Sequence, residues 1–323
     1  MTKKPDDLKR IHALIDAARR VLMITHVAPD GDAIGSLLGL GWYLQALGKL
    51  VTLACEDPVP DSYRSLPGSD RVVQRVDGAY DLVISLDCSD RRRMGSVYDD
   101  AWTSIPVINI DHHVTNTLFG TVNWVDVSRA ATAHIILDLA DAYQWQTTEA
   151  IATCLLTGIV TDTRSFRTSN VDRDTVQAAL HLMDAGASLS EVARRSLEQR
   201  PLSTVRLWGQ AFERLHLEDG ILWTEITSDM RRAVGLPENG SKGLANFLSG
   251  IREAQVVVVF AERDDDTVDV GMRSVPGIDV AQVALSLGGG GHPQASGCTL
   301  AEPLPDVKDR VLTELRRSLA QQR

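Results

Sequence analysis

The sequence lacks several features that would assign it to a specialised class of protein. Its four cysteines lie far apart and form no C-x-x-C pair, and a chain of 323 residues needs no disulfide staples, so we expect reduced thiols. The longest strongly apolar run, Val256 to Ala261, is far shorter than the ~20 residues that a membrane span requires. Met1 to Arg20 mixes acidic and basic side chains and lacks the apolar core of a signal peptide. We therefore expect a cytoplasmic protein that does not bind a membrane.

Positive charge is also in short supply. Lys and Arg number 33 and Asp and Glu number 43, which gives a formal net charge of −10. Long duplex nucleic acid is held by many phosphate contacts on a basic face, and this charge balance argues against such a partner. Any phosphate chemistry must therefore be local. With 44% hydrophobic and 24% charged residues, the composition is that of a folded protein, and the length suggests about two domains.

The first half alternates short apolar runs with helical patterns, which predicts an α/β fold: a mostly parallel sheet flanked by helices. The clearest candidate strands are Val21 to Thr25, Leu50 to Cys55, Asp81 to Leu86 and Pro106 to Ile110. A helix that ends near Gly48 separates the first two strands. A fifth apolar run, Ile151 to Val160, is a strand or a buried helix, because periodicity alone does not separate the two.

The second half predicts a smaller α+β domain. Its candidate strands are Ile221 to Thr227, Gln255 to Glu262 and Thr267 to Arg273, and the last two form an antiparallel hairpin. Its candidate helices are Ser241 to Ile251, Ile278 to Leu287 and Pro305 to Ala320. A charged segment, Ser188 to Arg200, precedes Pro201 and is typical of a linker. We expect the first domain at 1–187, the linker at 188–205 and the second domain at 206–323.

Acidic and histidine side chains follow the apolar runs of the first half at the points where those runs end. In chain order they are His26, Asp30, Asp32, Asp87, Asp111, His112, His113 and Asp162. Taken singly, each could be an ordinary turn or helix N-cap residue. Because parallel strands end at one shared edge, where ligands of open α/β sheets bind, the repetition predicts one common cleft.

Four or five carboxylates in one cleft cannot all remain ionised unless cations offset their charge. Imidazole and carboxylate ligands without a thiolate favour manganese or magnesium over a structural zinc ion. Six ligands suffice for two ions if one carboxylate bridges them, and paired ions about 3.5–4 Å apart recur in phosphoester hydrolysis. The residues therefore predict a two-metal phosphoesterase, but they do not distribute the ligands between the ions.

These motifs resemble those of the DHH phosphoesterase family. In the first half the resemblance rests on His26-x-x-x-Asp30-x-Asp32, on Asp87, on the triplet Asp111-His112-His113 and on Asp162. In the second half it rests on Gly277 to Ala281 and on the run Gly288 to Gly297, which resemble the C-terminal DHH-associated domain. The stretch Thr161 to Arg167 is most similar to the NrnA-like branch, the bifunctional oligoribonucleases and 3′-phosphoadenosine-5′-phosphate phosphatases.

The resemblance implies a role for each residue. His26 and Asp30 would hold one divalent ion, and Asp32, His112 and Asp162 the other. Asp87 would bridge the two ions, for which manganese is implied, with magnesium as the alternative. Asp111 would orient the neighbouring imidazole, and His113 would touch the scissile phosphate or the leaving oxygen.

A glycine run in the second half is a candidate site for substrate phosphate. Successive backbone N–H groups of Gly288 to Gly291 can form an anion-binding nest, although glycines alone can also make a simple turn. Arg273 offers a guanidinium fork for a second phosphate. With the resemblance, we assign substrate binding to Arg273, Gly289, Gly290, Gly291 and His292.

The expected activity is the hydrolysis of short oligoribonucleotides to nucleoside monophosphates, together with removal of the 3′-phosphate of 3′-phosphoadenosine-5′-phosphate. The expected partners are short single-stranded RNA or small phosphorylated nucleotides, and the resemblance implies a homodimer. A phosphodiesterase of cyclic di-AMP and linear dinucleotides is the alternative that the sequence does not separate. The run Gly288 to Gly297 disfavours a pyrophosphatase, and the complete ligand set disfavours a non-catalytic nucleotide-binding regulator.

Overall fold

The computed structural model describes residues 5–98, 104–236 and 243–322 and divides into two units, Met1–Gln199 and Arg200–Arg323. The division falls inside the segment 188–205. This segment contains α6 (Leu189–Ala193), the π-helical turn η5 (Arg194–Glu198) and the start of α7 (Leu202–Phe212).

A six-stranded parallel sheet forms the centre of the first unit. Its strands are β1 (Arg20–Thr25), β2 (Leu50–Ala54), β3 (Val72–Val73), β4 (Leu82–Leu86), β5 (Val107–Asp111) and β6 (Val122–Val125). They lie in the order β3-β2-β1-β4-β5-β6, and every neighbouring pair is parallel. The prediction of a parallel α/β fold is confirmed, although β3 and β6 were not expected. The strand order reverses between β1 and β4, and such a switch point is where sheets of this kind bind ligands.

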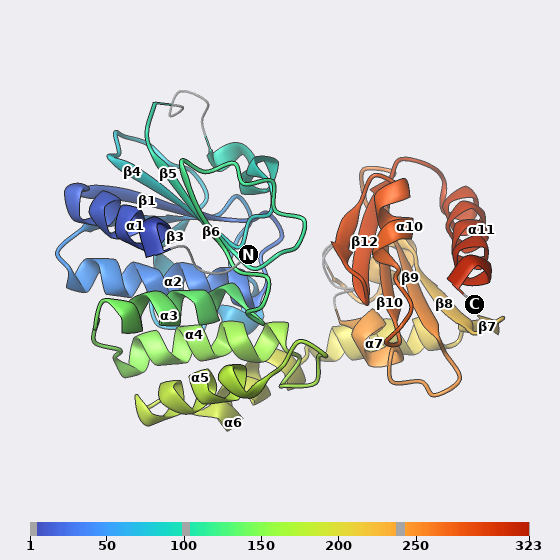
Figure 1. Cartoon of the computed structure of the whole chain (residues 1–323). Helices are drawn as coiled ribbons and strands as arrows, with labels where there is room; N and C mark the ends of the chain where they lie inside the picture. The colour runs from blue at the N-terminus through green and yellow to red at the C-terminus, as the bar shows by residue number, and fades with distance from the viewer. Residues whose placement is uncertain (1–4, 99–103, 237–242, 323) are drawn as a thin grey trace. The chain divides into compact units, whose positions relative to one another are not determined.

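Helices cover one face of this sheet, and Figure 1 shows α2, α3 and α4 together on that face, with α5 and α6 beyond them. Besides α6, the α-helices described in this unit are α1 (Pro5–Ala17), α2 (Gly31–Ala46), α3 (Thr132–Ala142), α4 (Glu149–Asp162) and α5 (Arg173–Asp184). Their apolar side chains join those of β1, β4 and β5 in one buried cluster. The opposite face carries a smaller cluster that includes Met94 and Val97 of the 3-10 segment η3 (Arg91–Val97). Two short 3-10 turns, η1 (Asp61–Tyr63) and η2 (Ser69–Arg71), follow β2.

The fifth apolar run is a helix, so its interpretation as a strand is wrong. Residues 151–160 lie within α4, which begins after Thr148, and the Thr148 side chain accepts the Ile151 N–H. Because α4 packs against α2, α3, α5 and α6, its residues are apolar on nearly all sides. Such a helix shows no amphipathic period, and for this reason the pattern could not separate it from a buried strand.

The second unit is built on a mixed sheet with the order β11-β12-β10-β9-β8-β7. Its strands are β7 (His216–Glu218), β8 (Ile221–Ile226), β9 (Val256–Glu262), β10 (Val268–Ser274), β11 (Gly290–His292) and β12 (Ala295–Leu300). Strands β8 and β9 are parallel, and the other neighbours are antiparallel, including the predicted hairpin β9–β10. The smaller α+β architecture is therefore confirmed.

Helices cover both faces of the second sheet. They are α7, α8 (Ser228–Ala233), α9 (Leu244–Leu248), α10 (Ala281–Ser286) and α11 (Leu304–Gln322). Apolar residues of α7, α8 and α9 form one buried cluster, and those of α10 and α11 form another on the opposite side of the sheet. The helix expected at 241–251 begins outside the described residues, and its described part is α9.

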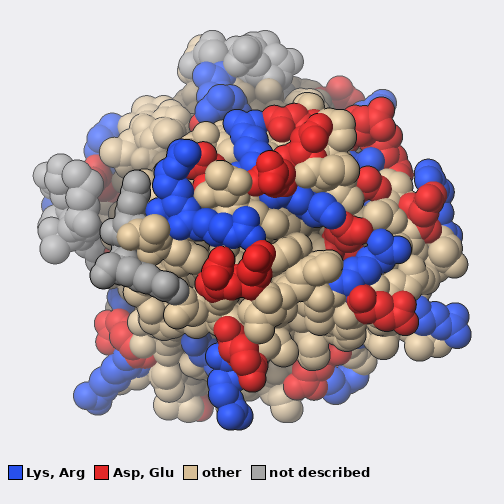
Figure 2. Space-filling view, turned by 90° about the vertical axis from the view of Figure 1, so that its right-hand side faces the viewer, with Lys and Arg blue, Asp and Glu red and all other residues tan. Residues whose placement is uncertain are grey.

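Charges of both signs are interspersed on the described surface drawn in Figure 2, where Lys and Arg side chains lie among Asp and Glu side chains. Several basic residues of the second unit are paired with acids, as in Lys308 with Glu225 and Arg316 with Glu218. Within the parts of the chain that the structure describes, no helix combines the length and apolarity needed to cross a membrane. The four cysteines are buried free thiols.

Candidate metal centre

The predicted ligands of the first unit meet at the carboxyl edge of its sheet, beside the switch point between β1 and β4. His26 and Asp87 directly follow β1 and β4, and His112 directly follows β5, the next strand in the order. Asp162 reaches the same place from the last residue of α4. Three neighbouring strands and one helix end therefore supply the side chains.

The first group of ligands is His26, Asp30 and Asp87, whose ligand atoms lie within 4.8 Å of one another. The Nδ1 of His26 lies 2.7 Å from the carbonyl oxygen of Val27. Because a carbonyl only accepts, Nδ1 carries the hydrogen and Nε2 is left to bind a metal ion. That Nε2 lies 3.4 Å from Asp87 Oδ2 and 3.9 Å from Asp30 Oδ1. Asp30 is also the N-cap of α2, so it serves a local and a site role together.

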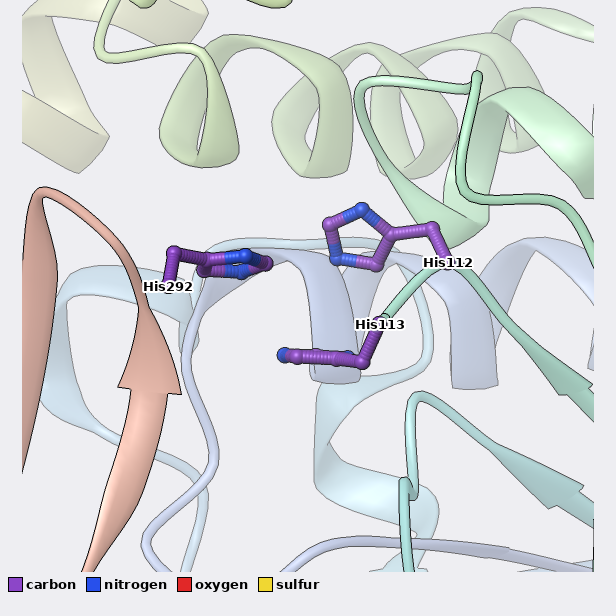
Figure 3. A group of neighbouring side chains, drawn as sticks. All are labelled: His112, His113 and His292. Carbon is purple, nitrogen blue, oxygen red and sulfur yellow. The ribbon is translucent and has the colours of Figure 1, made fainter. Parts of the chain in front are cut away.

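The second group is Asp32, His112 and Asp162, which also lie within 4.8 Å of one another. The Nε2 of His112 is 3.4 Å from Asp162 Oδ2, 3.6 Å from Asp87 Oδ1 and 4.0 Å from Asp32 Oδ2. Figure 3 shows His112 and His113 leaving the chain in succession, with their rings edge to face and centroids 4.6 Å apart. One imidazole nitrogen thus faces three carboxylates.

Asp87 lies between the two groups. Its Oδ2 faces His26, whereas its Oδ1 faces His112 at 3.6 Å. The residue has a left-handed backbone, with φ of 59°, directly after β4, and its N–H donates to the carbonyl oxygen of Ile110 on β5. Asp is among the residues that tolerate this conformation, which costs energy and is often found at functional sites. A carboxylate in this position could bridge two ions.

Asp111 contacts His113 within the site. Its Oδ1 lies 2.7 Å from His113 Nδ1 and accepts the backbone N–H of His112 at 2.8 Å. Burial lowers the pKa of His113, but the hydrogen bond to Asp111 and the charge of Asp87 outweigh burial and raise it to about 9. Asp111 is fully buried, and its hydrogen bond with Nδ1 of His113 orients that ring. A protonated His113 could contact a phosphate oxygen.

The charges in this cluster fit divalent cations. Burial, and then repulsion from neighbouring carboxylates, raises the pKa of Asp32 and of Asp162 well above the usual range. Burial would also raise the pKa of Asp87, but the hydrogen bond to His26 and the charges of His113 and His112 lower it instead. A cation among these oxygens would relieve the repulsion and the desolvation together. The oxygen and imidazole donors suit manganese or magnesium.

Three polar residues that the sequence reasoning missed form hydrogen bonds within or beside the site. Thr132 donates its hydroxyl to Asp87 Oδ1 at 2.9 Å. Asn116 places Nδ2 2.6 Å from Asp111 Oδ2, and its own Oδ1 accepts the Leu118 N–H. Asp57 accepts the N–H of Ala28, whose φ is 52°, at 2.5 Å. No local motif marks Thr132 or Asp57, but Asn116 follows the Asp-His-His triplet by three residues and could have been noticed.

The predicted substrate residues of the second unit lie in and beside β10 and β11, two strands of its sheet that are separated by β12. Arg273, in β10, donates from Nε to Asn246 Oδ1 at 2.6 Å and from Nη1 to the Met272 carbonyl at 2.7 Å. His292 ends β11, and it is the third side chain labelled in Figure 3. The expected nest is narrower than predicted, because the N–H groups of Gly288 and Gly289 donate to the carbonyls of Leu285 and Ala284.

Packing accounts for one of the glycines in this run. A Cβ at Gly289 would lie 2.1 Å from the carbonyl oxygen of Gly297, so β12 leaves no room for a side chain. A Cβ at Gly290, by contrast, would meet no atom within 4 Å. Packing against the described residues therefore does not require a glycine at position 290. The backbone there is open to approach, as contact with an anion would need.

Comparison with known proteins identifies both units. The family model described as DHH family, N-terminal domain, matches residues 20–159, and the DHHA1 domain matches residues 232–321. A bifunctional oligoribonuclease and PAP phosphatase NrnA from Thermus thermophilus is 39% identical over 93% of this chain and 90% of its own length.

Solved structures agree on the fold. An exopolyphosphatase-related protein from Bacteroides fragilis superposes with a TM-score of 0.87 at 21% identity, covering 99% of this chain and 98% of that one. RecJ from Thermus thermophilus, in complex with Mn2+, superposes with a TM-score of 0.55 at 17% identity, covering 98% of this chain and 56% of that one.

Proposed function

Because the chain belongs to the DHH family, we propose that it is a two-metal phosphoesterase acting on short oligoribonucleotides and on 3′-phosphoadenosine-5′-phosphate. The position of Asp87 carries this proposal, because its two oxygens face the two separate groups of His and Asp ligands. The substrates follow from the bifunctional oligoribonuclease and PAP phosphatase that is 39% identical over nearly the whole chain.

The first unit would hold two divalent ions. His26 and Asp30 would bind one, Asp32, His112 and Asp162 the other, and Asp87 both. Manganese is the first ion to test, since it is bound in the RecJ structure, and magnesium is the second. When bound, such ions supply a nucleophilic water and neutralise charge on the phosphate.

The protein groups around the ions have separate tasks in this proposal. His113, whose Nδ1 lies 2.7 Å from Asp111 Oδ1, would donate a hydrogen bond to a phosphate or leaving oxygen. Asp111 would hold that ring in place. In the second unit, Arg273, the backbone of Gly290 and Gly291, and the ring of His292 would bind the rest of the substrate, whereas the N–H of Gly289 is already bonded to the Ala284 carbonyl.

The net charge of −10 favours small substrates over long polyanions. We propose that the enzyme works in the cytoplasm, where its four free thiols stay reduced. We also propose a homodimer, which light scattering of the purified chain would test by its mass.

One assay tests the activity. Wild type and D87A are compared, with MnCl2 or with a chelator, on a linear diribonucleotide, 3′-phosphoadenosine-5′-phosphate, cyclic di-AMP, pyrophosphate and a long RNA. Removal of a residue that hydrogen-bonds to a metal ligand typically lowers metal affinity or activity by about 10–100-fold. Loss of the bridging ligand itself should therefore lower activity by more than about 100-fold. D61A is the matched control, because Asp61 is 81% exposed and pairs only with Arg64 among the interactions recorded for it.

We expect the wild type to cleave the first two substrates, and D61A to match it. Activity that survives chelation, or D87A activity within a few-fold of wild type, would contradict the two-metal site. Faster cleavage of cyclic di-AMP than of the linear dinucleotide would favour the cyclic dinucleotide alternative instead.

A further inference from the structure

Thr132, the first residue of α3, contacts ligands from both proposed metal groups. Its backbone N–H donates to Asp32 Oδ2 at 2.6 Å, and its hydroxyl donates to Asp87 Oδ1 at 2.9 Å. Thr132 is fully buried, as is Asp32, and Asp87 is 1% exposed. One residue therefore joins a carboxylate that follows β1 to another that follows β4.

The direction of each hydrogen bond is fixed by chemistry. A backbone N–H only donates, and an ionised carboxylate only accepts, so the Thr132 hydroxyl must spend its single hydrogen on Asp87. The hydroxyl thus restrains the rotation of the Asp87 carboxylate about its side-chain bonds. Rotation of this group would move both oxygens away from His26 and His112.

Asp32 accepts two further hydrogen bonds, one from the start of α3 and one from α2. Ala133 N–H donates to Asp32 Oδ1 at 2.9 Å, and the Ser36 hydroxyl donates to the same oxygen at 3.1 Å. The N-cap residue of α3 is Ala131, which has no side chain able to cap the helix. Asp32, 100 positions away in the sequence, accepts the first two N–H groups in its place. The N-terminus of α3, whose first N–H groups have no partner within the helix, therefore finds its acceptors on Asp32.

We propose that Thr132 is a positioning residue that couples the two metal sites, because its hydroxyl orients the bridging Asp87 while its backbone holds Asp32. The inference rests on the proposed two-metal function. It predicts that loss of the hydroxyl weakens the binding of both ions. Ser36 offers the contrast, because its recorded side-chain hydrogen bond reaches only Asp32, on one side of the bridge.

The test measures metal binding rather than activity. Isothermal titration calorimetry of MnCl2 into the metal-free protein, from which metal has been removed with a chelator, compares wild type with T132V, T132A, T132S and S36A. T132V and T132A both remove the hydroxyl and keep the backbone N–H, but the side chains that they introduce differ in volume. If one of these variants does not fold, the other is sufficient for the test. Thermal melting of each metal-free variant reports general damage to the fold.

We expect T132V and T132A to weaken both manganese binding steps by about 10–100-fold, the usual effect of removing a partner behind a ligand. T132S should stay within about 3-fold of wild type, because it keeps the donor, and S36A should weaken one step only.

Two results overturn the inference alone: a wild type that binds two ions with T132V and T132A unchanged, or a T132S as weak as T132A. A wild type that binds no manganese overturns the proposed function as well, so the two failures are distinguishable.

Discussion

Replacement of Gly158 by Ala should displace Asp32, one of the proposed ligands of the candidate metal centre. Gly158 lies within α4, and a Cβ there would be 2.6 Å from Asp32 Oδ1 and 2.6 Å from the Ala133 Cβ. Ordinary contacts of a Cβ begin near 3.4 Å, so Asp32 or α4 must move by roughly 1 Å. The space that Gly158 leaves is therefore filled by the carboxylate and by the start of α3.

The two effects of this substitution have opposite signs. Gly→Ala in a helix interior normally stabilises the helix by about 0.5–1 kcal/mol, because alanine loses less conformational freedom on folding. Overpacking of a buried site costs about 1–3 kcal/mol, so the net free energy of unfolding should fall by up to ~2.5 kcal/mol. A ligand displaced by about 1 Å can cost about 100-fold in rate, and we expect kcat of G158A to fall by roughly this factor.

The matched control is G209A. Gly209 lies within α7 of the second unit, it is exposed, and a Cβ there would meet no atom within 4 Å. G209A should gain stability and keep wild-type kcat. Urea unfolding in a chelator and dinucleotide hydrolysis with MnCl2 measure the two quantities. A G158A variant that is as stable as G209A and turns over at the wild-type rate would refute the argument.

Two further predictions concern single side chains of the first unit. D57A removes the acceptor that holds the Ala28 N–H and its strained backbone, and it should weaken manganese binding by about 10-fold in calorimetry; unchanged affinity would contradict this role. The second prediction concerns His113 in the metal-free chain. Burial lowers the pKa of His113, but Asp111 and Asp87 outweigh burial and raise this pKa to about 9, against ~6.5 in the unfolded chain. The stabilisation from protonated His113 is complete below about pH 6.5 and is lost as pH rises through about 9. The stability advantage of wild type over H113Q, measured by urea unfolding in EDTA, should therefore shrink by up to ~3 kcal/mol over this range. An advantage that does not depend on pH would contradict this role of His113.

Much of the first unit could be predicted because its strands are buried on both faces and end in polar residues. The runs that became β1, β2, β4 and β5 are mostly apolar, which is typical of a parallel sheet. Strands β3 and β6 have two and four residues, too few to show a pattern. Because parallel strands share an edge, the order of the motifs was enough to bring His26, Asp87 and His112 together. That they bind metal ions remains a prediction.

Other parts of the site depend on contacts that no local pattern records. Asp162 was expected after an apolar run that the sequence left open between a strand and a helix. It ends the helix α4, and the packing of α4 against α2 brings it to His112. That packing needs Gly35, where a Cβ would lie 2.4 Å from the Cys154 carbonyl oxygen. Thr132 acts on Asp32 across 100 positions, and a threonine at a helix start is too common to stand out.

The capping of α3 by Asp32 limits the choice of inactive variants for trapping a substrate. An asparagine at position 32 has one oxygen and an NH2 group, and that NH2 group would face a helix N–H, donor against donor. An alanine would leave the first turn of α3 without an acceptor in a dry environment. Either change would confound loss of metal with loosening of α3, so a crystallographer seeking a silent but intact active site should leave residue 32 alone.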